Sequence, residues 1–379
     1  MHLYRQTFMY GFAIFSMFFG SGNLVFPLQI GIESGNYWIL GFIGLFITGI
    51  ILPFLGLFVI KIHRGSYEMF FAEAGFIARF ILPLFTLSLL GSFGVVPRCI
   101  TVSYGGINNL IPEIPIIYFS LIFCISCYII CLKDHFMISL LGKWMTPILL
   151  ASLFILIIIG IINAPPILSA NEDPLNAFKD GFLRGYQTMD LFAAFFFSAL
   201  IFQQIQESLP GIRNTKDILK AALKPSIIGI TLLSIIYLGF VFLGAHYQSI
   251  ITTKAPELIL PEIATYIIGT KAALLIAITV IISCITTAVA LNNIYARYLC
   301  KLLIIKNKHF PWMLLVTTTI SFLISLLDFQ GIAAFLSPAL KISYPSLILL
   351  TILSILLRGY KKLKMMIFYG VILIMISWS

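Results

Sequence analysis

The chain has 379 residues, of which 60% are hydrophobic and 10% are charged, and its mean hydropathy is +1.06. Soluble domains carry about 25% charged residues, so this composition excludes a soluble globular protein and predicts an all-α polytopic membrane protein. The formal net charge of +10 is then interpreted as loop charge that sets orientation in the membrane, and we expect no nucleic-acid partner.

Apolar runs long enough to cross a bilayer recur along the whole chain. Lysines and arginines in alternate loops divide 18 to 4 when the N-terminus is placed inside. This bias predicts a cytoplasmic N-terminus, and eleven spans then place the C-terminus outside. The predicted spans cover residues 7–32, 38–60, 79–104, 115–132, 139–162, 187–206, 222–245, 271–298, 311–328, 333–357 and 363–378.

The first span contains the stretch FGSGNLVFP, which is interrupted by the small or polar residues Gly20, Ser21, Gly22 and Asn23. Non-helical backbone at membrane depth persists only where it lines protein or a wet cavity. A broken helix presents free carbonyls to cations and free N–H groups to carboxylates. We therefore predict a break that binds a small zwitterion, with its carboxylate on the N–H groups of Gly22, Asn23 and Leu24. The alternative is a continuous helix that packs through its small residues.

Two charged residues lie inside predicted spans at similar depth, Arg98 in the third and Asp190 in the sixth. A charge at the bilayer centre costs at least about 2.5–3.5 kcal/mol, and such groups usually pair or line water. We predict that they form an ion pair involved in gating. The alternatives are a snorkelling Arg98 and an Asp190 that stabilises the first helical turn.

Three cysteines of the fourth span, Cys124, Cys127 and Cys131, fall at i, i+3 and i+7 on one helical face. Small buried thiols are the favoured interpretation, and a metal or redox site is the alternative.

The polar segment 163–186 follows the fifth span and is predicted to be an outer loop. Five spans, a break and five more spans form an inverted-repeat layout, which is common in secondary transporters. The predicted units are residues 1–162 and 163–357 as two repeats, followed by an additional transmembrane helix in residues 358–379.

The sixth span carries the run FAAFFFSAL at residues 192–200. A branched aliphatic substrate needs an apolar pocket with a few placed polar groups, and we predict that Ala194, Phe195 and Ser198 contribute to it. The alternative is an aromatic run that faces the core or lipid. In the eighth span Ser283, Thr286 and Thr287 share one helical face and could bind a small hard cation, or their hydroxyls could bond back to their own helix.

Several stretches together resemble the branched-chain amino acid transport system II carrier family. They are YGFAIFSMFFGSGNLVFPLQIG (10–31), VVPRCITVSY (95–104), GFLRGYQTMDLFAAFFF (181–197), ISCITTAVAL (282–291) and, more weakly, LSPALKISYP (336–345). The resemblance implies a leucine-transporter-type fold of two inverted five-helix repeats with discontinuous first and sixth helices. It implies symport of leucine, isoleucine and valine with sodium or a proton across the cytoplasmic membrane. It also implies a sodium site between the first and eighth spans, at Phe19, Ser283, Thr286 and Thr287.

The chain departs from the family pattern at several positions. The family has about twelve spans, one more than the eleven predicted here. Lys341 stands where the family has a neutral residue, and we expect its ammonium group to pair with Asp328 or to reach a cavity. Two alternatives therefore stay open beside a working carrier: an amino-acid-binding membrane receptor and a degenerate carrier that has lost activity. No nucleophile elbow, zinc-ligand pair or acidic metal motif is present in the sequence, so we expect neither an enzyme nor a cofactor apart from the coupling ion.

Overall fold

The structure, a computed structural model, describes residues 2–108, 111, 113–132, 146–167, 173–208, 215–251, 255–305, 307–357 and 359–378. Each predicted span contains a helix, and the described part of the chain has no strand. Among these described residues, five helical segments are long and apolar enough to cross a membrane, and five shorter apolar helices accompany them. Residues 139–145, the predicted start of the fifth span, lie outside the described residues.

The first span is broken, as predicted, into α1 (His2–Phe18) and α2 (Ser21–Ser34). Gly20 lies between them in an extended conformation, with φ −118° and ψ −159°. Its backbone N–H donates to the Asn23 side-chain oxygen at 3.3 Å. The Asn23 side chain of α2 therefore caps the break, because it accepts from a backbone N–H that the helix leaves without a partner.

The second span runs without a break through α3 (Trp38–Phe46), a π-helical segment (Ile47–Ile51) and α4 (Leu52–Ile62). The third span, predicted as one helix, is divided into α6 (Ala78–Leu90) and α7 (Val95–Asn108). The turn between them needs glycine, since a Cβ on Gly94 would lie 2.1 Å from the Leu89 carbonyl oxygen.

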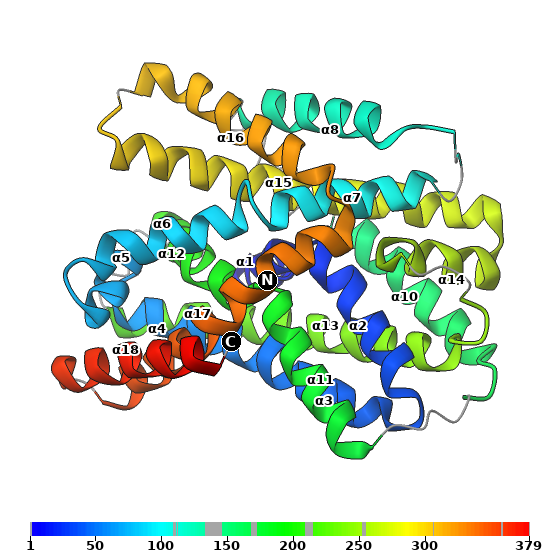
Figure 1. The fold of residues 1–379 in the computed structure, drawn as a ribbon, viewed down its shortest axis with the longest axis horizontal. Coiled ribbons are helices and arrows are strands. Elements are labelled where there is room, and N and C mark those ends of the chain that lie inside the picture. Colours follow the sequence, from blue (N-terminus) through cyan, green and yellow to red (C-terminus); the bar gives the residue numbers. More distant parts are fainter. Residues whose placement is uncertain are drawn as a thin grey trace.

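The predicted outer loop 163–186 is wrong over its second half. Helix α11 (Pro174–Gln187) occupies it and packs along α3 and α2 (Figure 1). Thr188 and Met189 then separate α11 from α12 (Asp190–Ser208), and Met189 has a positive φ of 59°. The sixth span is therefore discontinuous, as the family resemblance implied, but its first half lies in the segment that polar composition had assigned to a loop.

The remaining helices correspond to the other predicted spans and to two short connecting helices. They are α5 (Tyr67–Phe71), α8 (Ile116–Cys131), α10 (Thr146–Ile162), α13 (Thr215–His246), α14 (Ile259–Ile268), α15 (Thr270–Leu302), α16 (Phe310–Ser325), α17 (Asp328–Leu356) and α18 (Lys361–Trp378).

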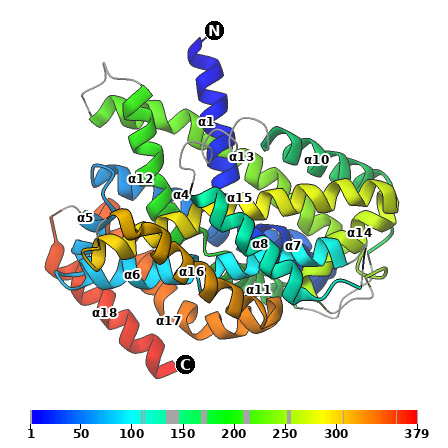
Figure 2. The same ribbon diagram turned by 90° about the horizontal axis from the view of Figure 1, so that it is seen from above.

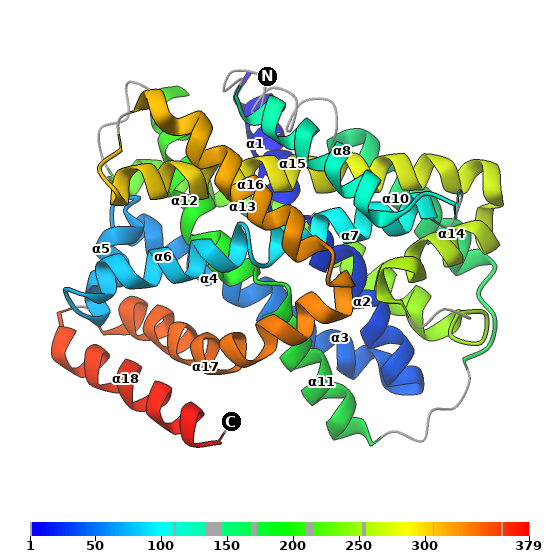
Figure 3. The same ribbon diagram turned by 45° about the horizontal axis from the view of Figure 1, so that its top comes forward.

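Helix contacts recur in matching pairs. The first half-helix α1 packs on α13 as the first half-helix α11 packs on α3, and the second half-helix α2 packs on α13 as the second half-helix α12 packs on α4. Helices α7 and α15 pack on each other, as do α8 and α16 (Figures 1 and 3). In Figure 2 the start of α1 and the end of α12 extend from the same side of the molecule. The two broken helices therefore run in opposite directions through the body of the protein.

Charged side chains tie the helices together at the ends of the bundle. Arg184 of α11 binds Glu33 of α2 through two nitrogens, and its Nη1 donates to Gln29 at 3.1 Å. At the other end Glu68 accepts from Arg79 at 3.0 Å and from Lys301 at 2.6 Å. Burial alone would raise the pKa of Glu68, but these two cations outweigh it and hold the pKa below its ordinary value.

Candidate functional site

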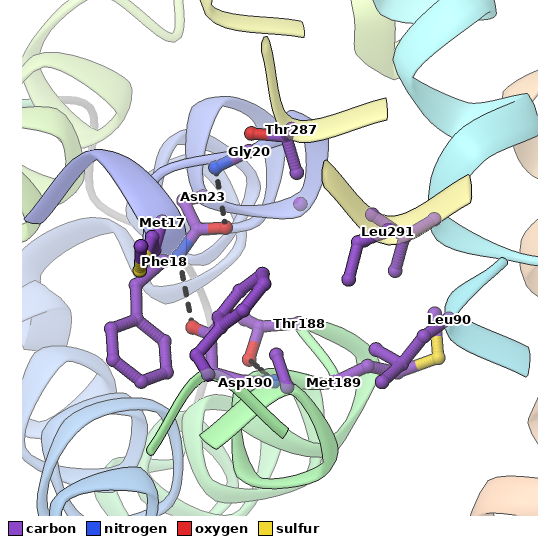
Figure 4. A pocket seen from close by; sticks show the side chains of 14 residues that line it. Met17, Phe18, Gly20, Asn23, Leu90, Thr188, Met189, Asp190, Thr287 and Leu291 are labelled. Atoms are coloured by element: carbon purple, nitrogen blue, oxygen red, sulfur yellow. Dashed lines mark hydrogen bonds between the residues drawn. The ribbon is translucent and has the colours of Figure 1, made fainter. Parts of the chain in front are cut away.

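The two helix breaks meet at a small pocket in the middle of the fold (Figure 4). Its volume is about 10 Å³, roughly the space that one water molecule needs. A larger ligand therefore requires movement of the flexible side chains around it. The walls come from α1, α2, α6, α7, α12, α15 and the α11–α12 break: Met17, Phe18, Gly20, Gly22, Asn23, Leu90, Val95, Thr188, Met189, Asp190, Ala193, Phe197, Thr287 and Leu291.

Asp190 is the acidic group of this pocket, and its exposed fraction is only 3%. The Asn23 side-chain nitrogen donates to Asp190 Oδ2 at 2.9 Å, and the Tyr237 hydroxyl donates to the same oxygen at 3.1 Å. The Asn23 nitrogen also donates to the Tyr237 hydroxyl. Three helices, α2, α12 and α13, are thus joined through one carboxylate oxygen at the level of the break.

Asn23 was predicted to be a substrate ligand, but the structure gives its amide another role. Its nitrogen is used by Asp190 and Tyr237, and its oxygen accepts the Gly20 N–H. The side chain therefore shapes the corner and orients the acid. Asp190 lies within hydrogen-bond distance of Asn23, so an acidic side chain stands beside the first break.

The predicted cation-binding oxygens converge on the end of α1. The Ser283 hydroxyl lies 3.0 Å from the Phe19 carbonyl oxygen, and the Thr287 hydroxyl lies 3.5 Å from it. Hard cations of calcium-like size take oxygens at about 2.3–2.6 Å, so oxygens about 3 Å apart can share one ion. Thr286 instead donates to the Ser283 carbonyl at 2.7 Å, so the alternative of bonding back to the helix holds for this residue.

Arg98 is not paired with Asp190, so the predicted ion pair is wrong for this conformation. Arg98 Nη1 donates to the Gln187 carbonyl oxygen at 2.6 Å. Its guanidinium carbon lies 5.3 Å from the centre of the Phe26 ring and 5.5 Å from that of Phe329. Nε and Nη2 are buried and have no hydrogen-bond partner within the described part of the chain. Arg98 therefore links α7 to α2, α17 and the end of α11.

Because Arg98 and Asp190 do not form the predicted pair, we expect them to contribute to stability independently. Arg98 and Asp190 share no hydrogen-bond partner, so the effects of Arg98→Met and Asp190→Asn on unfolding free energy should add to within about 0.5 kcal/mol. Arg98→Met alone should change stability by less than about 2 kcal/mol. The desolvation cost of the guanidinium, about 2.5–3.5 kcal/mol, is nearly balanced by one charge-assisted hydrogen bond of about 1.5–3 kcal/mol and by its aromatic contacts. Unfolding of both single variants and the double variant measures the coupling, and a coupling above about 1.5 kcal/mol would restore the direct pair.

Three of the residues predicted to bind substrate from the sixth span lie on the other face of α12. Ala194 and Phe195 pack beside Gly56 of α4, and the Phe195 ring lies 4.9 Å from the Phe70 ring. Ser198 donates to the Leu57 carbonyl oxygen at 2.9 Å. The residues of α12 that line the pocket are Asp190, Ala193 and Phe197, which follow i, i+3 and i+7. This periodicity, counted from Asp190, was the sequence signal that could have identified them.

Gly20 and Gly22 of the first break line the pocket as predicted, whereas Ser21 and Leu24 are buried outside its wall. One aromatic pair lines the pocket, and a second lies against Arg98. The Phe18 and Phe197 rings meet edge to face at 6.0 Å, and the Phe26 and Phe329 rings lie 5.6 Å apart.

Two further sets of residues named from the sequence are found as follows. Lys341 is exposed on α17 and lies thirteen residues from Asp328, about 20 Å along a helix, so the predicted pairing with Asp328 is wrong. Cys124, Cys127 and Cys131 are buried free thiols, and the described residues contain no cluster of metal-ligating side chains.

The comparisons with known proteins agree with this architecture. A family model described as "Branched-chain amino acid transport protein" matches residues 4–379. A protein of Staphylococcus saprophyticus, named as a candidate branched-chain amino acid carrier, is 27% identical over 373 residues, which cover 93% of this chain and 82% of the relative. A similarly named protein of Staphylococcus aureus is 28% identical over 370 residues, covering 92% and 81%.

Two solved structures share the fold. One is a Na⁺-coupled sialic acid symporter in a substrate-bound outward-open state, with a TM-score of 0.57 and 11% identity over 97% of this chain and 88% of that one. The other is Mhp1, a nucleobase-cation-symport-1 family transporter in a closed conformation, with a TM-score of 0.55 and 14% identity over 98% and 92%. The family and both structural neighbours are transporters rather than enzymes.

Proposed function

Because the chain belongs to the branched-chain amino acid transport protein family, we propose that it carries leucine, isoleucine and valine across the cytoplasmic membrane in symport with sodium or a proton. The observation that carries this proposal is the pocket where the breaks of α1–α2 and α11–α12 meet. Free backbone groups, one acid and an apolar wall converge there, which is the combination that a zwitterion with a branched aliphatic side chain requires.

The proposed orientation has a cytoplasmic N-terminus and eleven spans. Residues 1–162 and 163–357 form two inverted repeats, and residues 358–379 add a further helix. The matching helix contacts of the two halves support the repeats. The opposite directions of the two broken helices support their inversion (Figure 2).

In the proposed binding mode the substrate carboxylate accepts from the first N–H groups of α2, which have no partner within the helix. The aliphatic side chain packs among Phe18, Ala193, Phe197 and Leu291, which line the pocket. Leucine has about three more carbon groups than alanine. At about 0.8 kcal/mol per buried methylene, burial favours leucine by about 2.4 kcal/mol, or roughly 50-fold.

In the proposed coupling site sodium binds the Phe19 carbonyl and the hydroxyls of Ser283 and Thr287. These oxygens are neutral, so they suit a monovalent ion that is released again during the cycle. When bound, the ion supplies positive charge at the carbonyl end of α1, where the helix dipole is negative. The ion would also bridge α1 to α15, and we expect this to link ion occupancy to the position of α1.

Uptake of labelled leucine into proteoliposomes, with sodium and proton gradients imposed separately, tests the function. We expect uptake to follow one of the two gradients. For sodium coupling, Thr287→Val should raise the half-saturating sodium concentration about 10-fold, the loss expected for one neutral ligand worth about 1.4 kcal/mol. Thr319→Val removes an exposed hydroxyl on α16 and serves as the matched control.

Two results would contradict the proposal. Leucine binding without flux under either gradient would indicate a receptor rather than a carrier. A sodium dependence that is unchanged in Thr287→Val would exclude α15 as the ion-binding helix.

A further inference from the structure

The carboxyl group of Asp190 is buried, and the described residues place no cationic side chain beside it. Its exposed fraction is 3%, and among the described residues no lysine, arginine or histidine nitrogen lies within 4.0 Å of it. An isolated ionised carboxylate is expensive to remove from water, and charges inside membrane proteins usually pair or mark the path of a ligand.

The neighbours of Asp190 orient it but do not neutralise it. Asn23 and Tyr237 donate neutral hydrogen bonds, and both bonds end on Oδ2. The Thr188 hydroxyl donates to the Gly185 carbonyl oxygen at 2.9 Å and is a third neutral neighbour of the carboxyl group. Asp190 also forms part of the pocket wall (Figure 4), so a donor on a ligand in the pocket can reach its carboxyl group. When Asp190 is ionised, the compensating positive charge therefore has to come from a ligand in the pocket.

The position of Asp190 favours a substrate cation over a second sodium ion. The oxygens that suit a metal ion, those of Phe19, Ser283 and Thr287, lie at the end of α1 and on α15, and none of them is a hydrogen-bond partner of Asp190. An ammonium group carries three N–H donors and gains strongly from a charged acceptor. The pocket wall also contains apolar side chains, which suit the rest of an aliphatic amine.

We propose that Asp190 binds the α-ammonium group of the substrate, with Asn23 and Tyr237 as positioning residues. This inference rests on the proposed function and names the chemical class that the site accepts. The pocket takes aliphatic molecules with a free primary ammonium, and it rejects the corresponding carboxylic acids that lack one, because those leave the buried carboxylate unpaired and add a second negative charge.

The test is competition with labelled leucine on purified full-length protein, using two analogues that each lack one end of leucine. In the wild-type protein 3-methylbutylamine, which keeps the ammonium, should compete at least about 30-fold better than 4-methylpentanoate, which keeps the carboxylate. Asp190→Asn preserves the size of the side chain and should weaken leucine binding at least about 30-fold. The preference for the amine over the acid should disappear in this variant.

The control is Asp173→Asn, which removes an exposed acid at the start of α11 and should change none of these values. Tyr237→Phe removes one donor to Asp190 and should weaken leucine binding about 3- to 10-fold, the effect of one hydrogen bond. The preference for the amine should be retained in Tyr237→Phe, because the carboxylate is still present.

Several results would overturn the proposal without touching the proposed function. Equal competition by the two analogues in the wild-type protein would do so, and this measurement does not depend on the folding of any variant. Wild-type leucine affinity in Asp190→Asn would do so as well. A raised sodium requirement in Asp190→Asn with unchanged analogue preference would assign the acid to an ion instead. Failure of the wild-type protein to bind or transport leucine at all would contradict the proposed function itself.

Discussion

Replacing Gly22 by leucine is expected to abolish leucine binding while the protein still inserts and folds. Gly22 lines the pocket, and a Cβ there would meet the Phe26 ring at 3.2 Å and the Thr188 Cα at 3.3 Å. Those neighbours must yield by a few tenths of an ångström, and overpacking of this kind costs about 1–3 kcal/mol. The rest of the new side chain would enter the space that the substrate needs.

Binding of labelled leucine by the purified, monodisperse variant measures this effect. Gly370→Leu is the matched control, because nothing lies within 4 Å of a Cβ built on Gly370 and its leucine binding should be unchanged. A well-folded Gly22→Leu protein with wild-type affinity would exclude this stretch as the substrate-binding backbone. Loss of assembly in place of loss of binding would favour the alternative of a small-residue packing face.

Replacing Gly181 by valine is expected to prevent assembly of the bundle. A Cβ on Gly181 of α11 would lie 2.0 Å from the Gly41 carbonyl oxygen of α3, so two helix backbones would have to separate. Gly185 of the same helix is restricted in the same way, with its Cβ position 1.8 Å from the Thr48 hydroxyl. The contact that fixes the first half of the broken sixth span would be lost, at a cost of at least about 3 kcal/mol.

The measurement is the fraction of monodisperse protein after extraction from the membrane, together with its thermal unfolding midpoint. Gly370→Val serves as the control and should behave as wild type. A Gly181→Val protein that extracts and unfolds like the control would mean that α11 does not pack closely on α3. The assignment of segment 174–187 to the buried bundle would then be wrong.

The sequence by itself determined the main apolar helices, apart from α11 and the division of the third span, and it determined the first break. Apolar runs of bilayer length identified the main helices because lipid forces the backbone to satisfy its own hydrogen bonds. The corner at Gly20 was predictable for the same reason, since a glycine-rich polar stretch inside such a run is tolerated only beside protein or water. The hydroxyls of Ser283 and Thr287 were found because helical periodicity places them on one face, and the family resemblance supplied the partner carbonyl of Phe19.

The tertiary structure decided which side chains meet, since that depends on packing between segments far apart in the chain. The polar composition of residues 174–187 predicted a loop where the structure has helix α11. This helix is held by close backbone contact with α3 at its glycines, and hydropathy does not measure such contact. Composition does not distinguish Ala194, Phe195 and Ser198 from Ala193 and Phe197. The orientation of α12 about its axis places only Ala193 and Phe197 in the pocket wall. The sequence also indicated that Arg98 and Asp190 needed partners. Only the fold showed that Arg98 contacts the Gln187 carbonyl oxygen and two aromatic rings. It also showed that Asp190 lines the pocket, where the proposed counterion is the substrate ammonium group.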